Sequence, residues 1–469
     1  MVANNFLPSA VKFHYIFNLR DIANVFGGLL RSNPAFVSSP LVLVQQFMHE
    51  AFRVYRDRLV TDADMRRFDE MVLEVAKKHF SSIEGYEKAI EADPNVFTSF
   101  CTNTGDDTMP YLPVKSWEQL QKTLDLQLSE HNETNAVMNL VLFTDAMEHV
   151  TRIVRIIEQP RGNALLVGVG GSGKQSLARL AAFVCAYETF QITVTSAYTL
   201  ASFREDLVYL YKRAGVKAIG ILFLLTDQQI VDEKFLVCMN DMLSSGDIPN
   251  LLAIDEVDEV CNAIRPKVKQ EGIIDTRENC WEFYIEEVRK YLHVALCFSP
   301  VGDTFRVRAR QFPALVSCTQ IDWFHAWSGD ALVAVAQRFV GEITHLTSEQ
   351  QENMANHMAH VHGAVTIASE EYYDAERRRN YVTPKSFLEL IALYKQMLDK
   401  KLGEVSALKE RLESGLDKLN ATSAMVAELQ GIVCSTPYRR PSQNFRLRVL
   451  SRLGALWVSK EVLEQGRLP

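Results

Sequence analysis

Apolar residues recur at helical spacing through the first part of the chain. The pattern covers residues 17–30 and 41–58, where apolar side chains repeat every three or four positions. A third helix is predicted from Asp62 or Asp64, either of which is suited to cap its first turn. We therefore predict that residues 1–91 form a helical domain.

Strand and helix patterns alternate in the middle of the chain. Residues 92–132 begin with a stretch rich in Asn, Thr, Asp and Pro and are predicted to be a linker, followed by a long helix over 133–157. The predicted strands are 164–169, 191–194, 219–225, 294–298 and 315–318, with helices at 176–187 and 200–214 and an irregular stretch after the third strand. This alternation predicts an α/β domain over 133–341, a parallel sheet sandwiched by helices.

The pattern becomes helical again from about residue 342. Between Leu398 and Val426, Leu or Val recurs mostly at alternating steps of three and four residues, which is a heptad seam. We predict one long coiled-coil helix over 387–430. Because a single helix cannot bury such a seam, this helix needs a partner, and no helix of matching length is evident elsewhere in the sequence.

Composition and charge narrow the classes of function. Of 469 residues, 47% are apolar and 23% are charged, and no apolar run is long enough to span a membrane. The formal charge of −8 argues against bulk attraction to nucleic acid, so we expect neither nucleic acid nor membrane as a partner. The eight cysteines form no C-x-x-C pair, which indicates reduced thiols in an intracellular compartment. The segment 431–469 is basic and lacks periodicity, and we predict a poorly ordered tail.

The sharpest motif in the sequence is a glycine-rich loop. The run Gly168-Val-Gly-Gly-Ser-Gly-Lys174 fits G-x-x-x-x-G-K, follows an apolar strand and precedes a helix. Backbone N–H groups in such a loop point inward and bind phosphate, and the lysine reaches the terminal phosphates of a nucleotide. The predicted nucleotide-binding residues of the loop are Gly168, Gly170, Gly171, Ser172, Gly173, Lys174, Gln175 and Ser176.

The residue after the lysine is unusual for a hydrolytic site. A Ser or Thr hydroxyl normally binds Mg²⁺ at this position, whereas this chain has Gln175. Either Gln175 offers its amide oxygen, or Ser176 substitutes as a poor replacement. Nucleotide binding tolerates this change better than metal-assisted hydrolysis does. The sequence therefore predicts ATP or ADP as ligand, with any Mg²⁺ held through the nucleotide, Gln175 and an acidic residue.

Two acidic residues compete for the Mg²⁺ position at the end of a buried strand. Asp227 follows the better apolar strand, whereas Asp255 is followed by Glu256 and matches the usual motif but has only a short apolar run before it. The acidic cluster at Asp255 is also typical of a solvated helix start. We favour Asp227, and on that choice Gln228 stands where a catalytic glutamate would be and cannot act as a base.

Two further groups carry weaker signals. Arg306, Arg308 and Arg310 would either reach a phosphate at a neighbouring subunit edge or form the solvent face of a strand or loop. The histidines at 357, 360 and 362 are interpreted as a polar helix face rather than as a metal site.

Long runs of the sequence resemble one known family, the axonemal dynein heavy chains. The fourth AAA+ module of these chains is closely resembled by the run that leads into the glycine-rich loop, by Cys297-Phe-Ser-Pro-Val-Gly302 and by two later segments. The segment nearest the N-terminus is similar to the lid of the third module. The matching runs are 139–177, 297–302, 312–324, 381–390 and 13–21. The resemblance covers about residues 6–430.

The resemblance implies a domain organisation. Residues 1–91 would be the lid remnant of the preceding module, 133–341 the large α/β subdomain, and 342–386 its helical lid. Residues 387–430 would begin the stalk coiled coil, and the basic tail would lie outside the family. The chain would then be a fragment or truncated isoform of a heavy chain.

The resemblance also implies roles for single residues. Val141 and Leu142 would line the adenine pocket, and Asp227 aligns with the acidic strand end. Ser299 lies where related proteins often have a polar residue that senses the terminal phosphate. Arg20 matches the lid arginine of the third module.

Several positions depart from the family pattern. Cys318 occupies the place of an arginine finger, Gln175 and Gln228 replace residues that hydrolysis needs, and the lid arginine position falls near Lys385-Ser386. Together these departures imply a regulatory module that holds nucleotide with weak or absent hydrolysis. The alternative is a nucleotide-independent structural spacer of the ring and base of the stalk.

The resemblance implies partners and a location as well. The partners would be the other AAA+ modules of the heavy chain, the returning stalk helix and, in the full motor, the dynein intermediate and light chains. The location would be the cytoskeleton of the ciliary or flagellar axoneme. We expect no direct microtubule binding from this chain, because it holds no match to the tip of the stalk.

Overall fold

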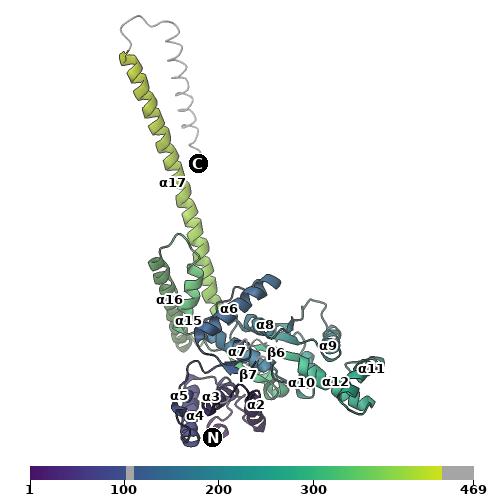
Figure 1. Cartoon of the computed structure of the whole chain (residues 1–469). Helices are drawn as coiled ribbons and strands as arrows, with labels where there is room; N and C mark the ends of the chain where they lie inside the picture. Colours follow the sequence, from purple (N-terminus) through teal and green to yellow (C-terminus); the bar gives the residue numbers. More distant parts are fainter. Residues whose placement is uncertain (38, 102–109, 436–469) are drawn as a thin grey trace. The chain divides into compact units, whose positions relative to one another are not determined.

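The computed structural model describes residues 1–37, 39–101 and 110–435 (Figure 1). By their contacts they divide into two compact units, Met1–Ala392 and Leu393–Pro469, the second described as far as residue 435. Within these described ranges, no helix combines the length and the apolar character that crossing a membrane requires. The tail predicted over 431–469 lies outside the described residues from residue 436 on.

The first part of the chain is helical, as its apolar spacing predicts. Its elements are α1 (Val2–Asn5), α2 (Leu19–Leu29), α3 (Pro40–Ala51), the π-helical turn η1 (Phe52–Arg56), α4 (Asp62–Phe80) and α5 (Tyr86–Ile90). Helix α4 begins where expected, but its cap is Thr61, whose hydroxyl accepts the N–H of Asp64 at 3.4 Å. Neither predicted aspartate caps the helix, because both already lie inside its first turn.

A five-stranded parallel sheet forms the centre of the first unit and confirms the predicted α/β class. The strands are β3 (Ala164–Val167), β4 (Glu188–Phe190), β5 (Ile221–Thr226), β6 (Leu292–Phe298) and β7 (Gln320–Trp323), in the order β4-β5-β6-β3-β7. A separate antiparallel pair consists of β1 (Phe97–Thr98) and β2 (Leu112–Pro113).

Alternate residues of each strand point into two different cores. In β3, Leu165 and Val167 join one core, whereas Ala164 and Leu166 join the other, as the two-residue period of a strand requires. The first core is covered by α9 (Leu200–Gly215), α10 (Lys234–Ser244), α11 (Ile254–Gln270) and α12 (Arg277–Tyr291). The second is covered by α6 (Trp117–Thr134), α7 (Thr144–Ile157) and α8 (Lys174–Val184) (Figure 1).

Two predicted strands are wrong in position. The second strand is β4, at 188–190 instead of 191–194. The segment 315–318 belongs mainly to a short helix, α14 (Ala314–Ser317), and the strand is β7, which begins at Gln320. The pattern hid β7 because two of its four residues, Gln320 and Asp322, are polar, although three of the four residues of this edge strand are buried.

Three helical assignments also need correction. The predicted linker over 92–132 contains most of α6, whose Leu120, Leu124 and Leu128 are buried in the second core. The helix predicted from residue 133 begins only at Thr144, after an extended segment. The stretch predicted to be irregular in fact holds three helices, α10, α11 and α12.

The C-terminal part of the described chain is helical, as predicted. Helices α15 (Gly329–Val340) and α16 (Ser348–Glu376) pack against each other, and the three histidines at 357, 360 and 362 lie on α16. Helix α17 (Pro384–Ser435) contains the heptad segment. Within the second unit its seam is exposed at Val405, Leu412, Leu416, Leu419 and Val426.

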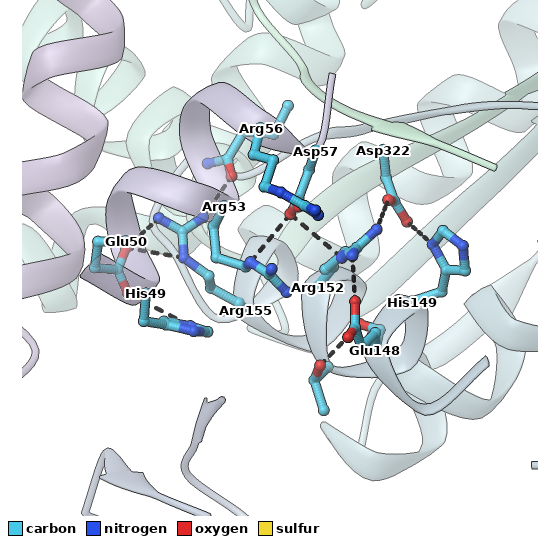
Figure 2. Close-up of polar contacts among 12 residues, drawn as sticks. His49, Glu50, Arg53, Arg56, Asp57, Glu148, His149, Arg152, Arg155 and Asp322 are labelled. Carbon is cyan, nitrogen blue, oxygen red and sulfur yellow. Dashed lines mark hydrogen bonds and ion pairs between the residues drawn. The ribbon is translucent and has the colours of Figure 1, made fainter. Parts of the chain in front are cut away.

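A buried ion pair joins the N-terminal helices to the α/β part of the first unit. Arg155 of α7 and Glu50 of α3 have side chains that are 2% and 0% exposed, and the Arg155 Nε donates to Glu50 at 2.9 Å (Figure 2). Tyr111 donates its hydroxyl to Glu50 at 2.8 Å, and Arg155 also donates to Gln320 of β7 at 2.7 Å. The pair is therefore satisfied on both sides, which a buried charge requires.

A second centre of the same network forms around Arg152. Its guanidinium pairs with Asp322 of β7 at 3.0 Å, with Asp57 at 3.4 Å, and with Glu148 one turn earlier in α7 (Figure 2). His149 contacts the other Asp322 oxygen at 2.7 Å. These contacts explain how a carboxylate is tolerated inside a central sheet.

Candidate nucleotide-binding site

The glycine-rich loop connects β3 to α8, as its sequence predicts. Gly171 and Gly173 have φ values of +79° and +86°, which residues with a side chain rarely adopt. A Cβ on Gly171 would lie 2.4 Å from the Cβ of Lys385, and a Cβ on Gly168 would lie 2.6 Å from that of Phe324. Glycine is therefore required at these positions by the backbone conformation or by a close neighbour.

Lys174 is the first residue of α8 and points back into the loop. Its ammonium donates to the carbonyl oxygens of Gly168 and Val169 at 2.6 and 2.8 Å, and contacts the Ser172 hydroxyl at 3.2 Å. Burial lowers the pKa of Lys174 below its usual range. An anion in the loop would offer this half-desolvated cation a stronger partner than neutral carbonyl groups do.

A cavity of about 590 Å³ opens beside the loop. Its polar lining comes from the loop and the strand ends, and includes Gly170, Gly171, Ser172, Gly173, Lys174, Gln175, Ser176, Asp227, Gln228 and Ser299. Its apolar lining includes Leu140, Val141, Phe143, Trp327, Val335, Phe339 and Leu388. A cavity with one phosphate-binding end and one apolar end has the amphipathic character of a nucleotide.

The apolar end was only partly predictable from the sequence. Val141 lines the cavity as expected, whereas Leu142 is buried in the second core and lines a neighbouring cavity. Trp327 and Phe339 were missed, because they follow the loop by more than 150 residues and no local pattern marks them. Gly168, at the end of β3, supports the loop without lining the cavity.

Asp227 stands directly after the C-terminal end of β5, and both of its carboxylate oxygens have partners. One oxygen accepts the backbone N–H of Ser299 at 2.5 Å, and the other accepts from Arg308 at 3.2 Å. Burial raises the pKa of Asp227, and these two donors oppose the rise. Ser299 thus engages the site through its backbone, while Gln228 lines the cavity as an exposed residue.

The rival acidic residue lies elsewhere. Asp255 is an exposed residue in the first turn of α11, and Glu256 caps that helix by accepting the N–H of Ala253 at 3.0 Å. Lys212 pairs with Glu256 at 2.9 Å. Asp255 and Glu256 therefore form the solvent-exposed start of a helix. This geometry favours Asp227 over Asp255 as the acidic residue at the end of a buried strand.

The alternating arginines lie in a helix, α13 (Thr304–Gln311), and not in a strand or loop. Arg306 pairs with Asp303 near the start of the same helix, at 2.8 Å. Arg308 instead turns inward to Asp227 and to Glu233. Sequence reasoning missed this contact because it depends on how the ends of β5 and β6 are brought together in the sheet.

The residues present fit Mg²⁺ poorly. Mg²⁺ prefers near-octahedral oxygen ligands, which usually include a hydroxyl from the loop and a free carboxylate oxygen. Gln175 and Asp227 both line the cavity, but Gln175 supplies no hydroxyl and Asp227 already accepts from two protein donors. The Ser176 hydroxyl also lines the cavity, but it is one position further along the helix than the usual metal-binding hydroxyl. The two predicted metal ligands therefore share one cavity, and the carboxylate is already engaged by protein donors.

Two further residues that the sequence singled out, Arg20 and Lys385, each contact another such residue. Arg20 donates to the Ser317 carbonyl and contacts the Cys318 sulfur at 3.3 Å, so these two residues, to which the resemblance gives separate roles, lie side by side. Lys385 begins α17 and packs against Gly171 of the loop. Lys385 therefore lies next to the glycine-rich loop.

The sheet, the loop and the helical segments together define a P-loop module of the AAA+ class. The family described as "P-loop containing dynein motor region D4" matches residues 138–397, and the family described as "AAA+ lid domain" matches residues 1–89. The chain belongs to the dynein motor family, which confirms the resemblance read from the sequence.

Relatives in several organisms are similar over most of the chain. The beta chain of flagellar outer-arm dynein from Chlamydomonas reinhardtii is 52% identical over 92% of this chain, and the ciliary dynein beta chain of Tripneustes gratilla is 50% identical over 94%. Human dynein axonemal heavy chain 9 is 49% identical over 92%. In each case the chain spans 10% of the length of the relative.

Proposed function

We propose that this chain is a nucleotide-holding regulatory module of an axonemal dynein heavy chain, which binds ATP or ADP and hydrolyses it slowly or not at all. The observation that carries the proposal is the loop geometry, with Lys174 held at the start of α8 beside a cavity of about 590 Å³. P-loop modules of this family imply nucleotide binding, generally with Mg²⁺.

Weak hydrolysis follows from the residues that replace the catalytic ones. Gln228 lines the cavity where a carboxylate would polarise water, and an amide cannot accept the proton. Gln175 replaces the metal-binding hydroxyl. Loss of such groups lowers turnover far more than it lowers affinity, because binding depends mainly on the loop amides and the lysine.

In the full heavy chain, this module would report the state of the motor ring to the stalk. Lys385, at the start of α17, packs against Gly171. A conformational change in the loop would therefore displace the first turn of that helix. The wider role would be microtubule-based movement of cilia or flagella. Its partners would be the neighbouring AAA+ modules, the returning stalk helix and the associated chains of the motor.

The test is a titration of the whole chain with a fluorescent ADP or ATP analogue, with Lys174→Ala as the control. Loss of a charged phosphate contact should weaken binding about tenfold to a hundredfold. Absence of binding, or equal binding by the variant, would reject the nucleotide site and favour the structural spacer. Phosphate release well above the Lys174→Ala background would reject weak hydrolysis.

A further inference from the structure

Arg308 occupies an unusual place beside the nucleotide cavity. Its side chain is 9% exposed, and its guanidinium donates to Asp227 at 3.2 Å. Asp227 lines the cavity at the end of β5, whereas Arg308 comes from α13, which follows β6. A buried cation therefore lies against the carboxylate that in related chemistry binds the metal ion.

A second carboxylate fixes the position of this arginine. Glu233, the residue before α10, accepts from the Nε and the Nη2 of Arg308 at 3.0 and 2.9 Å. Two nitrogen atoms of a planar guanidinium are thus engaged by Glu233, and a third reaches Asp227. The arginine cannot leave Asp227 without breaking contacts on both sides.

The other cation near the loop is engaged elsewhere. Lys174 donates to two loop carbonyl groups and to Ser172, and no hydrogen bond or ion pair joins it to Asp227 among the described residues. An uncompensated carboxylate beside the phosphate groups of a nucleotide would repel them. Arg308 is the cation that contacts Asp227 directly, whereas Lys174 acts on this carboxylate only through space.

We propose that Arg308 is a built-in counter-cation that takes the place of Mg²⁺ at Asp227, so that this site binds nucleoside di- and triphosphates with an affinity that depends little on Mg²⁺. This inference rests on the proposed nucleotide-binding function and specifies its metal requirement. Arg308 acts here as a positioning residue, because it holds Asp227 and does not line the cavity. Gln175, which lacks a hydroxyl, is consistent with a site that does not rely on a metal.

The experiment measures the affinity of the whole chain for a fluorescent ADP analogue in Mg²⁺ and in EDTA. For the wild type, the two dissociation constants should agree within about threefold, because the carboxylate is neutralised without metal. For Arg308→Gln, binding in EDTA should be at least about tenfold weaker than in Mg²⁺, because the metal then becomes the only cation in direct contact with Asp227.

The chain offers a matched control on the same helix. Arg306→Gln makes the same change two residues away, where the arginine pairs with Asp303 and not with Asp227. This variant should keep the wild-type ratio of the two constants. Arg308→Lys, which retains a positive charge, should fall between the wild type and Arg308→Gln.

A rescue variant separates the proposed role from simple destabilisation. In Asp227→Asn/Arg308→Gln the carboxylate charge is removed together with its partner, so tight binding in EDTA should return. The rescue also provides a folded protein if Arg308→Gln is destabilised because Asp227 lacks a cationic partner.

Three results would overturn the inference. They are a wild-type affinity that falls more than about tenfold in EDTA, an Arg308→Gln variant with the wild-type ratio, and a double variant that still needs Mg²⁺. Metal-dependent binding by the wild type would reject this inference alone. Absence of wild-type binding in both conditions would reject the proposed function as well.

Discussion

Replacing Arg155 by methionine removes the only cation that contacts Glu50 directly within the described part of the network. The two side chains are 2% and 0% exposed, and the carboxylate would be left with the hydroxyl of Tyr111 as its hydrogen-bond partner. Burial alone would raise the pKa of Glu50, but Arg155 holds that pKa below its ordinary value. After the replacement, Glu50 must either remain charged without a positively charged partner or take up a proton.

The expected cost is large because both groups are buried. Breaking a buried ion pair from one side costs about 3–5 kcal/mol, most of which is the penalty for the charge left behind. Replacing both partners by neutral side chains of similar volume is often nearly neutral. We therefore expect Arg155→Met to lose about 3–5 kcal/mol, and Glu50→Gln/Arg155→Met to recover most of that loss.

The assay is urea unfolding of the whole chain, followed by tryptophan fluorescence and compared among the wild type, the two single variants and the double variant. The control is Arg161→Met, which breaks an ion pair with Glu286 whose side chains are 52% and 49% exposed. An exposed pair contributes at most about 1 kcal/mol, so this variant should unfold close to the wild type. A cost below about 1 kcal/mol for Arg155→Met, or additive costs in the double variant, would refute the reasoning.

Three further predictions concern the site and its surroundings. Gln228→Glu restores a base beside the cavity and should raise phosphate release about tenfold or more, and an unchanged rate would show that the missing base does not limit turnover. Gly171→Ala should lower the melting temperature, because the residue has a φ of +79° and a Cβ would meet Lys385, whereas Gly170→Ala, with open space around it, should not; equal melting of the two variants would contradict this. Burial lowers the pKa of His14 from 6.5 to about 4, so the unfolded chain binds the extra proton between these values and stability should fall as the pH drops from 6.5 to 4. His14→Gln should flatten this dependence in urea unfolding, and an unaltered slope would contradict the assignment.

The phosphate loop and the alternation around it were predictable because their signals are local. A tight anion-binding loop needs glycine at fixed positions, and here Gly171 and Gly173 have the positive φ values that make this necessary. The continuous apolar runs of β5 and β6 likewise predict buried parallel strands. The choice of Asp227 over Asp255 followed from the length of the strand before it, and the geometry supports it.

The misplaced elements share one physical cause. Strand β7 was missed because Asp322 is polar, and it is tolerated there only because His149 and Arg152 contact it from another element. Helix α6 was assigned to a linker because its buried leucines are separated by polar residues and the core they meet is built from distant segments. In both cases the burial of a residue depends on partners that lie far away in the sequence.

The sequence by itself determined the class of protein and the glycine-rich loop between a strand and a helix, and it placed Gln175 and Gln228 at the positions on which the proposal of weak hydrolysis rests. These features are set by backbone conformation and side-chain chemistry within a few residues, so they can be read from one segment at a time. Only the tertiary structure decided that Arg308 contacts Asp227, that Arg20 lies beside Cys318, and that Trp327 lines the cavity. Such contacts join residues from different elements, and their geometry is fixed only when the sheet brings the strand ends together.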